Sequence, residues 1–287
     1  MSAGPRQPAV AGQFYEADGA RLAKQIEGCF LSELGPGELP ARRRSPDRRI
    51  RAAVVPHAGF VYSGPIAALA YAAVAAERPP ASVLILGVDH RGGGAPAAVS
   101  DRDWSTPLGP VEVDHDLVRA LAHGPIEIDE ASHEHEHSIE VQLPFLQYVL
   151  PRPRIAALTV RFGPYDFLAT VASTVRTALR GRDALVLAST DFSHYVPAEE
   201  AQRLDRLALE MILRRDAKGL YDTVQRHEIS MCGIAPTTVL LGALSEEPLA
   251  ARLLRWGHSG EAEPMDRVVG YASVLLQSES ALASSGP

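Results

Sequence analysis

The chain has 287 residues, of which 46% are hydrophobic and 22% charged, and its formal net charge at pH 7 is −7. A mildly acidic chain lacks the basic face of a general nucleic-acid binder, so we expect no nucleic-acid partner. The longest apolar stretch, Pro65–Ala76, is shorter than the roughly 20 residues that a helix needs to cross a bilayer. We therefore expect no membrane partner either.

The cysteine content and the first residues indicate where the protein is found. Two cysteines, Cys29 and Cys232, are too few for a disulfide framework, which favours a reducing compartment. Residues Met1–Val10 lack the basic segment and the following apolar segment of a secretory signal. We expect a cytoplasmic protein.

Short apolar runs alternate with helical patterns along the first two thirds of the chain. An arginine-rich segment at about 41–51 precedes the first run, and its prolines favour a solvated loop over a phosphate-binding arm. Runs rich in Val, Ile and Leu are typical of buried parallel strands. The predicted strands are Ile50–Val55, Ser82–Val88, Arg154–Arg161 and Asp183–Ala188. The predicted helices are Pro65–Glu77, His115–His123 and Tyr165–Leu179.

The last third of the chain is mainly helical and ends with two more strands. Ala198–Leu244 has a helical pattern, whereas Arg252–Trp256 and Val268–Leu276 predict strands that join the sheet in antiparallel fashion. Strands that alternate with helices predict an α/β fold, with a mostly parallel (mixed) central sheet and helices on both faces. No shift in composition marks a linker. We predict one domain over residues 1–287 with a disordered tail at about 279–287.

Histidines follow three of the predicted strands. His57, His90 and His194 come shortly after the first, second and fourth of these strands, and Asp191 lies just before His194. In open α/β sheets, ligand sites form at the carboxyl ends of strands. A single histidine there is more often a structural residue, but three of them favour a shared pocket.

A second cluster alternates three histidines with two glutamates. We interpret His133 and His135 as parts of a polar loop, although three alternating histidines could also chelate a metal. His137 and Glu140 would share one face of the following helix-like run, because they are three residues apart. We expect both to line the pocket.

Cys232 precedes a helix-like run that begins near Pro236, and a helix N-terminus would favour its thiolate form. A thiolate could be a nucleophile or a metal ligand, but most free cysteines are small buried apolar side chains. From this residue alone, the structural interpretation is favoured. The chain has no phosphate-binding loop, dinucleotide fingerprint, serine nucleophile elbow or H-E-x-x-H motif.

Six short motifs are spread over nearly the whole chain. They are A-G-Q-F-Y at 11–15, V-P-H-A-G-F-V-Y-S-G at 55–64, L-G-V-D-H at 86–90, E-H-S-I-E-V-Q-L-P-F at 136–145, S-T-D-F-S-H at 189–194 and M-C-G at 231–233. In type and order they resemble the motifs of the Memo family, called AmmeMemoRadiSam system protein B in bacteria and archaea. The resemblance implies a fold like that of the class III non-haem iron extradiol dioxygenases, the LigB-like group.

The resemblance also implies a metal site. It places the family's ligands on His57, His90 and Cys232, with Asp191 and His194 lining the same pocket. In the dioxygenase relatives, the histidine that corresponds to His194 acts as an acid/base group.

Two features depart from these patterns. Asp89 stands where Asn or Ser is expected, and it could hydrogen-bond the pocket or compete for the metal. The thiolate of Cys232 replaces the carboxylate of the two-histidine, one-carboxylate triad of ring-cleaving iron enzymes, which argues against ring cleavage. We expect one transition-metal ion, iron or copper, with zinc as an alternative, because imidazole suits all three and thiolate favours copper(I) or zinc.

The resemblance leaves two main hypotheses for function, so whether the protein is an enzyme stays open. The first is a metal-dependent, dioxygenase-like redox protein that acts on oxygen or a small substrate. His194 would transfer protons and Asp191 would orient it or bind substrate. The expected substrate contacts are His137, Glu140 and Tyr62.

The second hypothesis is a non-catalytic module that binds a peptide or an anionic ligand in the same pocket. Metal-assisted hydrolysis is disfavoured, because no dedicated general-base glutamate stands next to a ligand, although Glu140 could serve. The bacterial family name further implies that AMMECR-type and radical-SAM proteins act in the same modification system.

Overall fold

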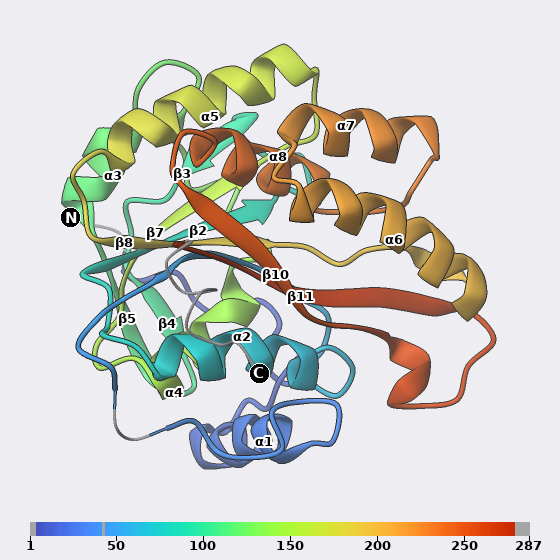
Figure 1. Cartoon of the computed structure of the whole chain (residues 1–287). Coiled ribbons are helices and arrows are strands. Elements are labelled where there is room, and N and C mark those ends of the chain that lie inside the picture. The colour runs from blue at the N-terminus through green and yellow to red at the C-terminus, as the bar shows by residue number, and fades with distance from the viewer. Residues whose placement is uncertain (1–3, 42–43, 279–287) are drawn as a thin grey trace.

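The computed structural model describes residues 4–41 and 44–278 (Figure 1). The tail predicted to be disordered, at about 279–287, lies outside the described residues, as do Arg42 and Arg43. Within the described part, eleven strands form one sheet and the buried apolar side chains form one core cluster, so the fold is a single α/β domain. None of the helices described is long and apolar enough to cross a membrane.

The sheet is mixed, and its centre is parallel. Its main path runs β10-β11-β1-β8-β2-β7-β3-β6, in which β1, β8, β2 and β7 are mutually parallel while β10 and β11 are antiparallel. The strands of this path are β1 (Ile50–Val55), β2 (Ser82–Val88), β3 (Ala97–Val99), β6 (Glu127–Ile128), β7 (Arg154–Val160), β8 (Ala184–Ser189), β10 (Leu249–His258) and β11 (Val268–Ser278). The strands off this path are β4 (Trp104–Thr106), β5 (Gly109–Val113) and β9 (His194–Val196).

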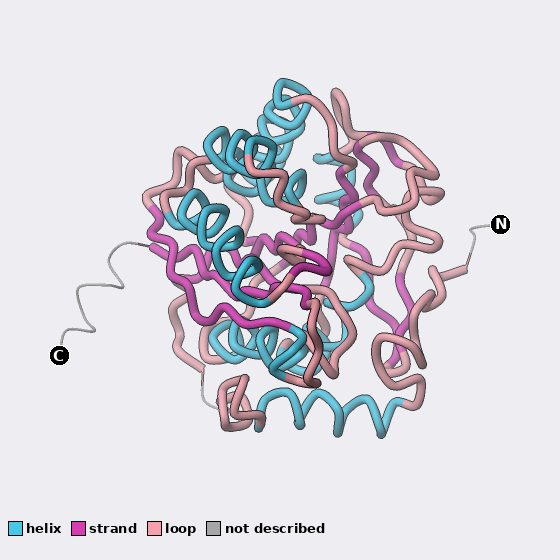
Figure 2. The backbone as a smooth tube through the Cα atoms, turned by 90° about the vertical axis from the view of Figure 1, so that its right-hand side faces the viewer, coloured by secondary structure: helices cyan, strands magenta, loops and turns pink. Residues whose placement is uncertain are grey.

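Helices cover both faces of the sheet (Figures 1 and 2). One face carries α1 (Gly19–Leu31), α2 (Gly64–Ala75) and α4 (Leu143–Val149). The other face carries α3 (His115–Leu121), α5 (Tyr165–Leu179), α6 (Ala198–Leu213), α7 (Ala217–Arg226) and α8 (Ile234–Ala243). α2 and α8 are apolar nearly all round, because each lies between the sheet and further helices. The described residues also include two short 3-10 helices, Glu140–Gln142 and Ser259–Glu261.

The predicted fold class is confirmed, with small differences in boundaries. β1, β2 and α5 have the predicted bounds, and β7 and β8 differ by one residue. The predicted helical region Ala198–Leu244 is three helices, α6 to α8, and the two late strands are antiparallel as expected. The sequence prediction missed α1 and the short strands β3 to β6 and β9.

The described residues 44–49 of the arginine-rich segment form no helix or strand, and most of them are exposed, in keeping with the predicted loop. Arg48 forms an ion pair with Asp183, just before β8, and Arg51 pairs with Glu247 at 2.9 Å, just before β10. These guanidinium groups bind the entry of β1 to both neighbouring parts of the sheet. Arg48 and Arg51 therefore have a structural role.

The order of the central strands determines where the site forms. β8 lies between β1 and β2, and all three run parallel, so their carboxyl ends lie at the same edge of the sheet. The loop after each strand therefore starts beside the other two. This is the position at which open α/β sheets bind ligands.

Candidate metal centre

Three side chains with metal-binding atoms converge at this edge. His57 follows β1, His90 follows β2 and Cys232 precedes α8, and one ligand atom from each lies within 4.8 Å of the others. The Sγ atom of Cys232 is 3.3 Å from Nε2 of His57. Two donors on one metal at bond lengths of about 2.0–2.3 Å are about 3.5 Å apart in a tetrahedral site. Small side-chain shifts would therefore bring this donor set around a single ion.

Cys232 reaches the two histidines because the chain passes very close to the end of β8. A Cβ atom on Gly233 would lie 2.2 Å from Cβ of Thr190, so only glycine fits at this position. The backbone N–H of Asp191 donates to Sγ of Cys232 at 3.2 Å. The thiol is thus anchored against the loop after β8.

The surroundings of Cys232 oppose the thiolate form that a helix N-terminus was expected to favour. Burial, and then the nearby carboxylate of Asp191, raise the pKa of the Cys232 thiol well above its usual range. α8 begins at Ile234, two residues after Cys232. The metal-free cysteine is therefore a thiol, and a cation would be needed to favour the thiolate.

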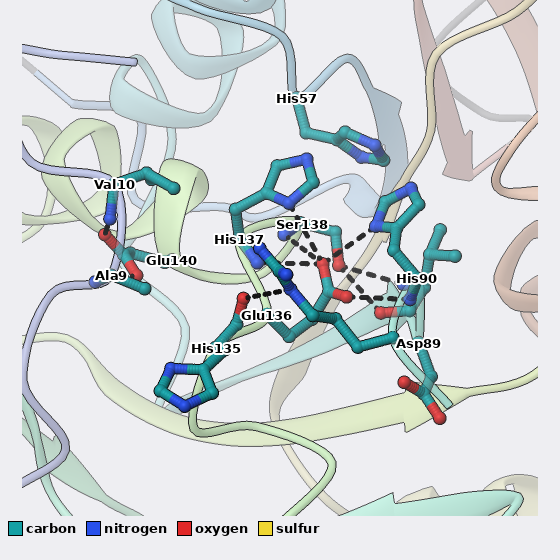
Figure 3. Close-up of polar contacts among 12 residues, drawn as sticks. Ala9, Val10, His57, Asp89, His90, His135, Glu136, His137, Ser138 and Glu140 are labelled. Atoms are coloured by element: carbon teal, nitrogen blue, oxygen red, sulfur yellow. Dashed lines mark hydrogen bonds and ion pairs between the residues drawn. The ribbon is translucent and has the colours of Figure 1, made fainter. Parts of the chain in front are cut away.

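His90 is held by a buried carboxylate that the sequence reasoning did not select. Oε1 of Glu136 accepts a hydrogen bond from Nδ1 of His90 at 2.9 Å, and Oε2 accepts from the His90 backbone N–H at 2.8 Å (Figure 3). Since a carboxylate only accepts, Nδ1 carries the proton and Nε2 keeps its lone pair. Burial opposes ionisation of Glu136, but hydrogen bonds from His90 and the Ser138 backbone outweigh it and hold the pKa of this carboxyl well below its usual range.

His137 adds a third imidazole to the cluster. Its ring stacks on His90 at 4.7 Å between centroids and lies 5.4 Å from the ring of His57 (Figure 3). Phe14 packs edge-on against it at 4.8 Å. Burial, only partly opposed by Glu136, lowers the pKa of His137 to about 4. His137 therefore lies in the pocket as a neutral ring near neutral pH.

His90, Glu136 and His137 also lie close enough together to hold a metal ion. However, Oε1 of Glu136 already accepts from the backbone N–H groups of His137 and Ser138, both at 2.8 Å, besides Nδ1 of His90. A carboxylate used in this way is better suited to support a ligand than to be one. We interpret this second group as part of the surroundings of the first.

Asp191 and His194 lie beside the same cluster. Oδ1 of Asp191 accepts from the His57 backbone N–H at 2.8 Å, and burial raises the pKa of Asp191 to about 6. Nδ1 of His194 lies 2.7 Å from the carbonyl oxygen of Phe192 and 2.8 Å from that of Ser230. Carbonyls, rather than Asp191, thus orient the His194 ring, while Asp191 holds the loop of His57.

Glu140 does not present its carboxylate to the cluster. It forms a buried ion pair with Arg6, and it accepts from the Val10 backbone at 3.0 Å and from the hydroxyl of Tyr15 at 2.6 Å. Figure 3 shows the carboxylate turned toward Ala9 and Val10. Glu140 anchors the N-terminal segment, so we do not retain it as a substrate contact or a base.

Two further residues have contacts outside the cluster. Asp89 accepts both a 3.0 Å and a 2.7 Å hydrogen bond from Arg161, and Figure 3 shows its carboxylate turned away from the histidine rings. It therefore does not compete for a metal in this arrangement. Tyr62 is half-buried and donates to Glu263 at 3.1 Å, so its hydroxyl is engaged by the segment between β10 and β11.

The histidines interpreted as loop residues are both outside the cluster. His133 is fully buried, with Nε2 3.0 Å from the carbonyl oxygen of Ala98 and its ring edge-on to Trp104. His135 is exposed, and Figure 3 shows its ring pointing away from His137. Of the three alternating histidines, only His137 reaches the site.

Comparisons with known proteins cover most of the chain. The profile of the family described as Memo-like protein matches residues 6–275. A MEMO1 family protein of Methanopyrus kandleri is 41% identical over 286 residues, which is 95% of this chain and 99% of the relative. One from Sulfolobus acidocaldarius is 41% identical over 281 residues, covering 94% of this chain and 98% of the relative. The crystal structure of uncharacterized protein JW3007 from Escherichia coli K12 shares the fold, with TM-score 0.55 and 14% identity over 79% of this chain and 99% of that chain.

Proposed function

This chain belongs to the Memo family, and from that membership and the geometry of the site we propose that it binds one transition-metal ion through His57, His90 and Cys232. The observation that carries the proposal is the convergence of two imidazole nitrogens and one sulfur within 4.8 Å, from loops far apart in sequence. Imidazole and thiolate together are a donor set for iron, copper or zinc.

The charges around the cluster support a cation rather than protons as its occupant. Burial, together with the neighbouring rings of His137 and His90, holds the pKa of His57 well below its usual range. The Nε2 lone pair of His57 is thus free near neutral pH. Glu136, which stays ionised, supplies buried negative charge directly behind His90. A site that repels protons yet keeps a buried carboxylate is suited to a metal ion.

We further propose that the metal is iron or copper and that the protein is an oxidoreductase acting on oxygen or a small substrate. Such an ion would supply one-electron chemistry. His194 would exchange protons through Nε2, because its Nδ1 proton is committed to the carbonyls of Phe192 and Ser230. His137 would contact the substrate beside the ligands, with Phe14 excluding water from that side. Tyr62 stays a proposed contact at the edge of the site.

The same proposal includes a cellular setting. We place the protein in the cytoplasm, with AMMECR-type and radical-SAM proteins as proposed partners in one modification system. The partnership can be tested by asking whether these proteins co-purify with this chain. The control is the same purification with a variant whose proposed metal site is disrupted.

The test of the proposed function is metal content. Untagged protein, reconstituted without oxygen and freed of loose ions, should hold about one iron or copper per chain by elemental analysis, and the double variant His57→Ala/Cys232→Ala should hold none. The variant Cys29→Ala is the matched control, because it alters the other cysteine. Equal and negligible iron, copper and zinc in the wild type and the double variant would refute the proposal and leave the ligand-binding module as the alternative.

A further inference from the structure

A buried chain of hydrogen bonds leads to the ring of His57 from the interior. The hydroxyl of Tyr71 donates to Oε1 of Gln142 at 2.6 Å, and Nε2 of Gln142 donates to the carbonyl of Pro56 at 2.9 Å and to Oγ of Ser189 at 2.8 Å. That Oγ lies 3.0 Å from Nδ1 of His57. All four side chains in the chain are at most 2% exposed, so water does not compete for these bonds.

Two backbone carbonyls fix the direction of the bonds in this chain. The carbonyl of Pro56 can only accept, so the nitrogen of the Gln142 amide must face it, and its second N–H points at Ser189. Oγ of Ser189 lies 2.6 Å from the carbonyl oxygen of Ser138, which also can only accept, so the single hydroxyl proton is used there. Oγ has no proton left for His57 and must accept from it.

We infer that Gln142 and Ser189 are positioning residues that hold His57 in its Nδ1–H tautomer and thereby keep the lone pair of Nε2 facing Cys232. The inference rests on the proposed metal site, and it concerns the residues that fix the tautomer of one proposed ligand, His57. In the opposite tautomer the proton would sit on Nε2, which lies 3.3 Å from the sulfur, and it would block the nitrogen for a metal. The chain of bonds excludes that tautomer before any ion arrives.

Two other histidines of the pocket, His90 and His194, reach the same state by a simpler route. The carboxylate of Glu136 accepts from His90, and two carbonyls accept from His194, so neither partner could donate. Of these three rings, His57 is the one that faces a hydroxyl, which could act in either direction. This is why His57 alone needs a second layer, in which Gln142 and the Ser138 carbonyl determine what Ser189 does.

The test reads the tautomer directly. Metal-free protein with ¹⁵N-labelled histidine should show, by multiple-bond NMR, a His57 ring with a protonated Nδ1 and a bare Nε2. Its signals are assigned by their loss in His57→Gln. In Ser189→Ala the ring should gain the Nε2–H form, and the affinity for Co²⁺ should fall about 10- to 100-fold, the usual effect of losing an outer hydrogen bond to a metal ligand. Tyr71→Phe is the matched control, because Pro56 still orients Gln142, and it should leave the tautomer and the affinity unchanged.

The outcomes separate this inference from the proposed function. A wild-type His57 with its proton on Nε2 overturns the inference, even if the protein binds Co²⁺ tightly. This measurement uses the wild type, so it does not depend on whether a variant folds. An unchanged tautomer and affinity in folded Ser189→Ala overturns it as well. A wild type with the Nδ1–H tautomer that binds neither Co²⁺, iron nor copper refutes the metal function and supports the positioning of His57 by Ser189.

Discussion

The Sγ atom of Cys232 lies 3.3 Å from Nε2 of His57, although 175 positions separate the two residues in sequence. The contact forms because β1 ends beside β8, and the segment before α8 packs against the end of β8. The sheet and one helix start therefore assemble a sulfur–nitrogen pair that no local sequence could place. Four predictions follow from this arrangement and its surroundings.

Replacing Cys232 by serine should remove the soft ligand and keep the shape of the site. We expect the affinity for Co²⁺ to fall by more than about 100-fold, beyond the effect of a lost supporting hydrogen bond, because a direct ligand is lost. The thiolate-to-metal charge-transfer band should disappear from the absorption spectrum of the Co²⁺ complex. Cys29→Ser should keep the band, since Cys29 packs against Phe60 in the core. A band that survives in Cys232→Ser would exclude this cysteine as a ligand.

The variant Glu136→Gln should weaken metal binding without removing a ligand. It replaces a group that only accepts by an amide. Whichever way the amide is turned, its N–H₂ would face either the backbone N–H or the Nδ1–H of His90. We expect a 10- to 100-fold loss of affinity for Zn²⁺, measured by calorimetric titration. Glu134→Gln, which alters an exposed carboxylate two positions earlier, should leave the affinity unchanged. Equal affinities in both variants would show that Glu136 does not support His90.

The variant Glu140→Gln should destabilise the fold and spare metal binding. Breaking its buried ion pair leaves Arg6 without a counter-charge, which costs about 3–5 kcal/mol of the free energy of unfolding. Urea unfolding measures this loss. The double variant Arg6→Met/Glu140→Gln should lose less than the sum of the two single variants, since the two side chains form one interaction. If Glu140→Gln lowered the metal affinity without lowering the free energy of unfolding, Glu140 would be part of the site after all.

Stability should depend on pH through His133, which lies outside the metal cluster. Burial lowers the pKa of His133 to about 4 in the folded protein, from an ordinary value of 6.5. Between these values the unfolded chain binds the proton and the folded chain does not, so the free energy of unfolding falls as the pH falls from 6.5 to 4. The total loss is about 3 kcal/mol.

The check is urea unfolding at a series of pH values, with a chelator present to keep the protein metal-free. In His133→Gln the amide can still donate to the carbonyl of Ala98 but cannot take up a proton. Its stability curve should be flatter than that of the wild type by the stated amount, because the other titrating groups are common to both proteins. Parallel curves would contradict the prediction.

The central strands were predictable because parallel strands covered by helices on both faces are apolar at nearly every position. β1 and β2 are such runs, and their bounds agree with the sequence. The segment Gly19–Leu31 also carried a signal that was missed. Asp18 caps its first turn, and Leu22, Ile26 and Cys29 recur at helical spacing. By contrast, β6 has two exposed residues and exists only through its pairing with β3.

The site divides in the same way. His57, His90 and Cys232 could be selected from the sequence because they lie in recognisable motifs next to predicted strand ends or a predicted helix start. Glu136 and Ser189 also lie in these motifs, but their roles could not be predicted, because those roles come from acceptors and donors brought together by the fold. Ser189 is simply the last residue of β8, and its proton is assigned by a carbonyl 51 positions away. Glu140 was mistaken for a pocket residue because helical spacing does not reveal a partner at position 6.

The place of β1 in the sheet has a consequence for the order in which the strands can pair as the chain folds. Its only neighbours in the described sheet are β8 and β11, both contributed by residues after 183. During synthesis β1 therefore waits, unpaired, until more than a hundred further residues have left the ribosome. Pairings of such long range are formed slowly, since loop closure must precede them. The nascent protein thus has no partial version of the proposed metal site, and the step that closes the sheet also brings His57 to its final position.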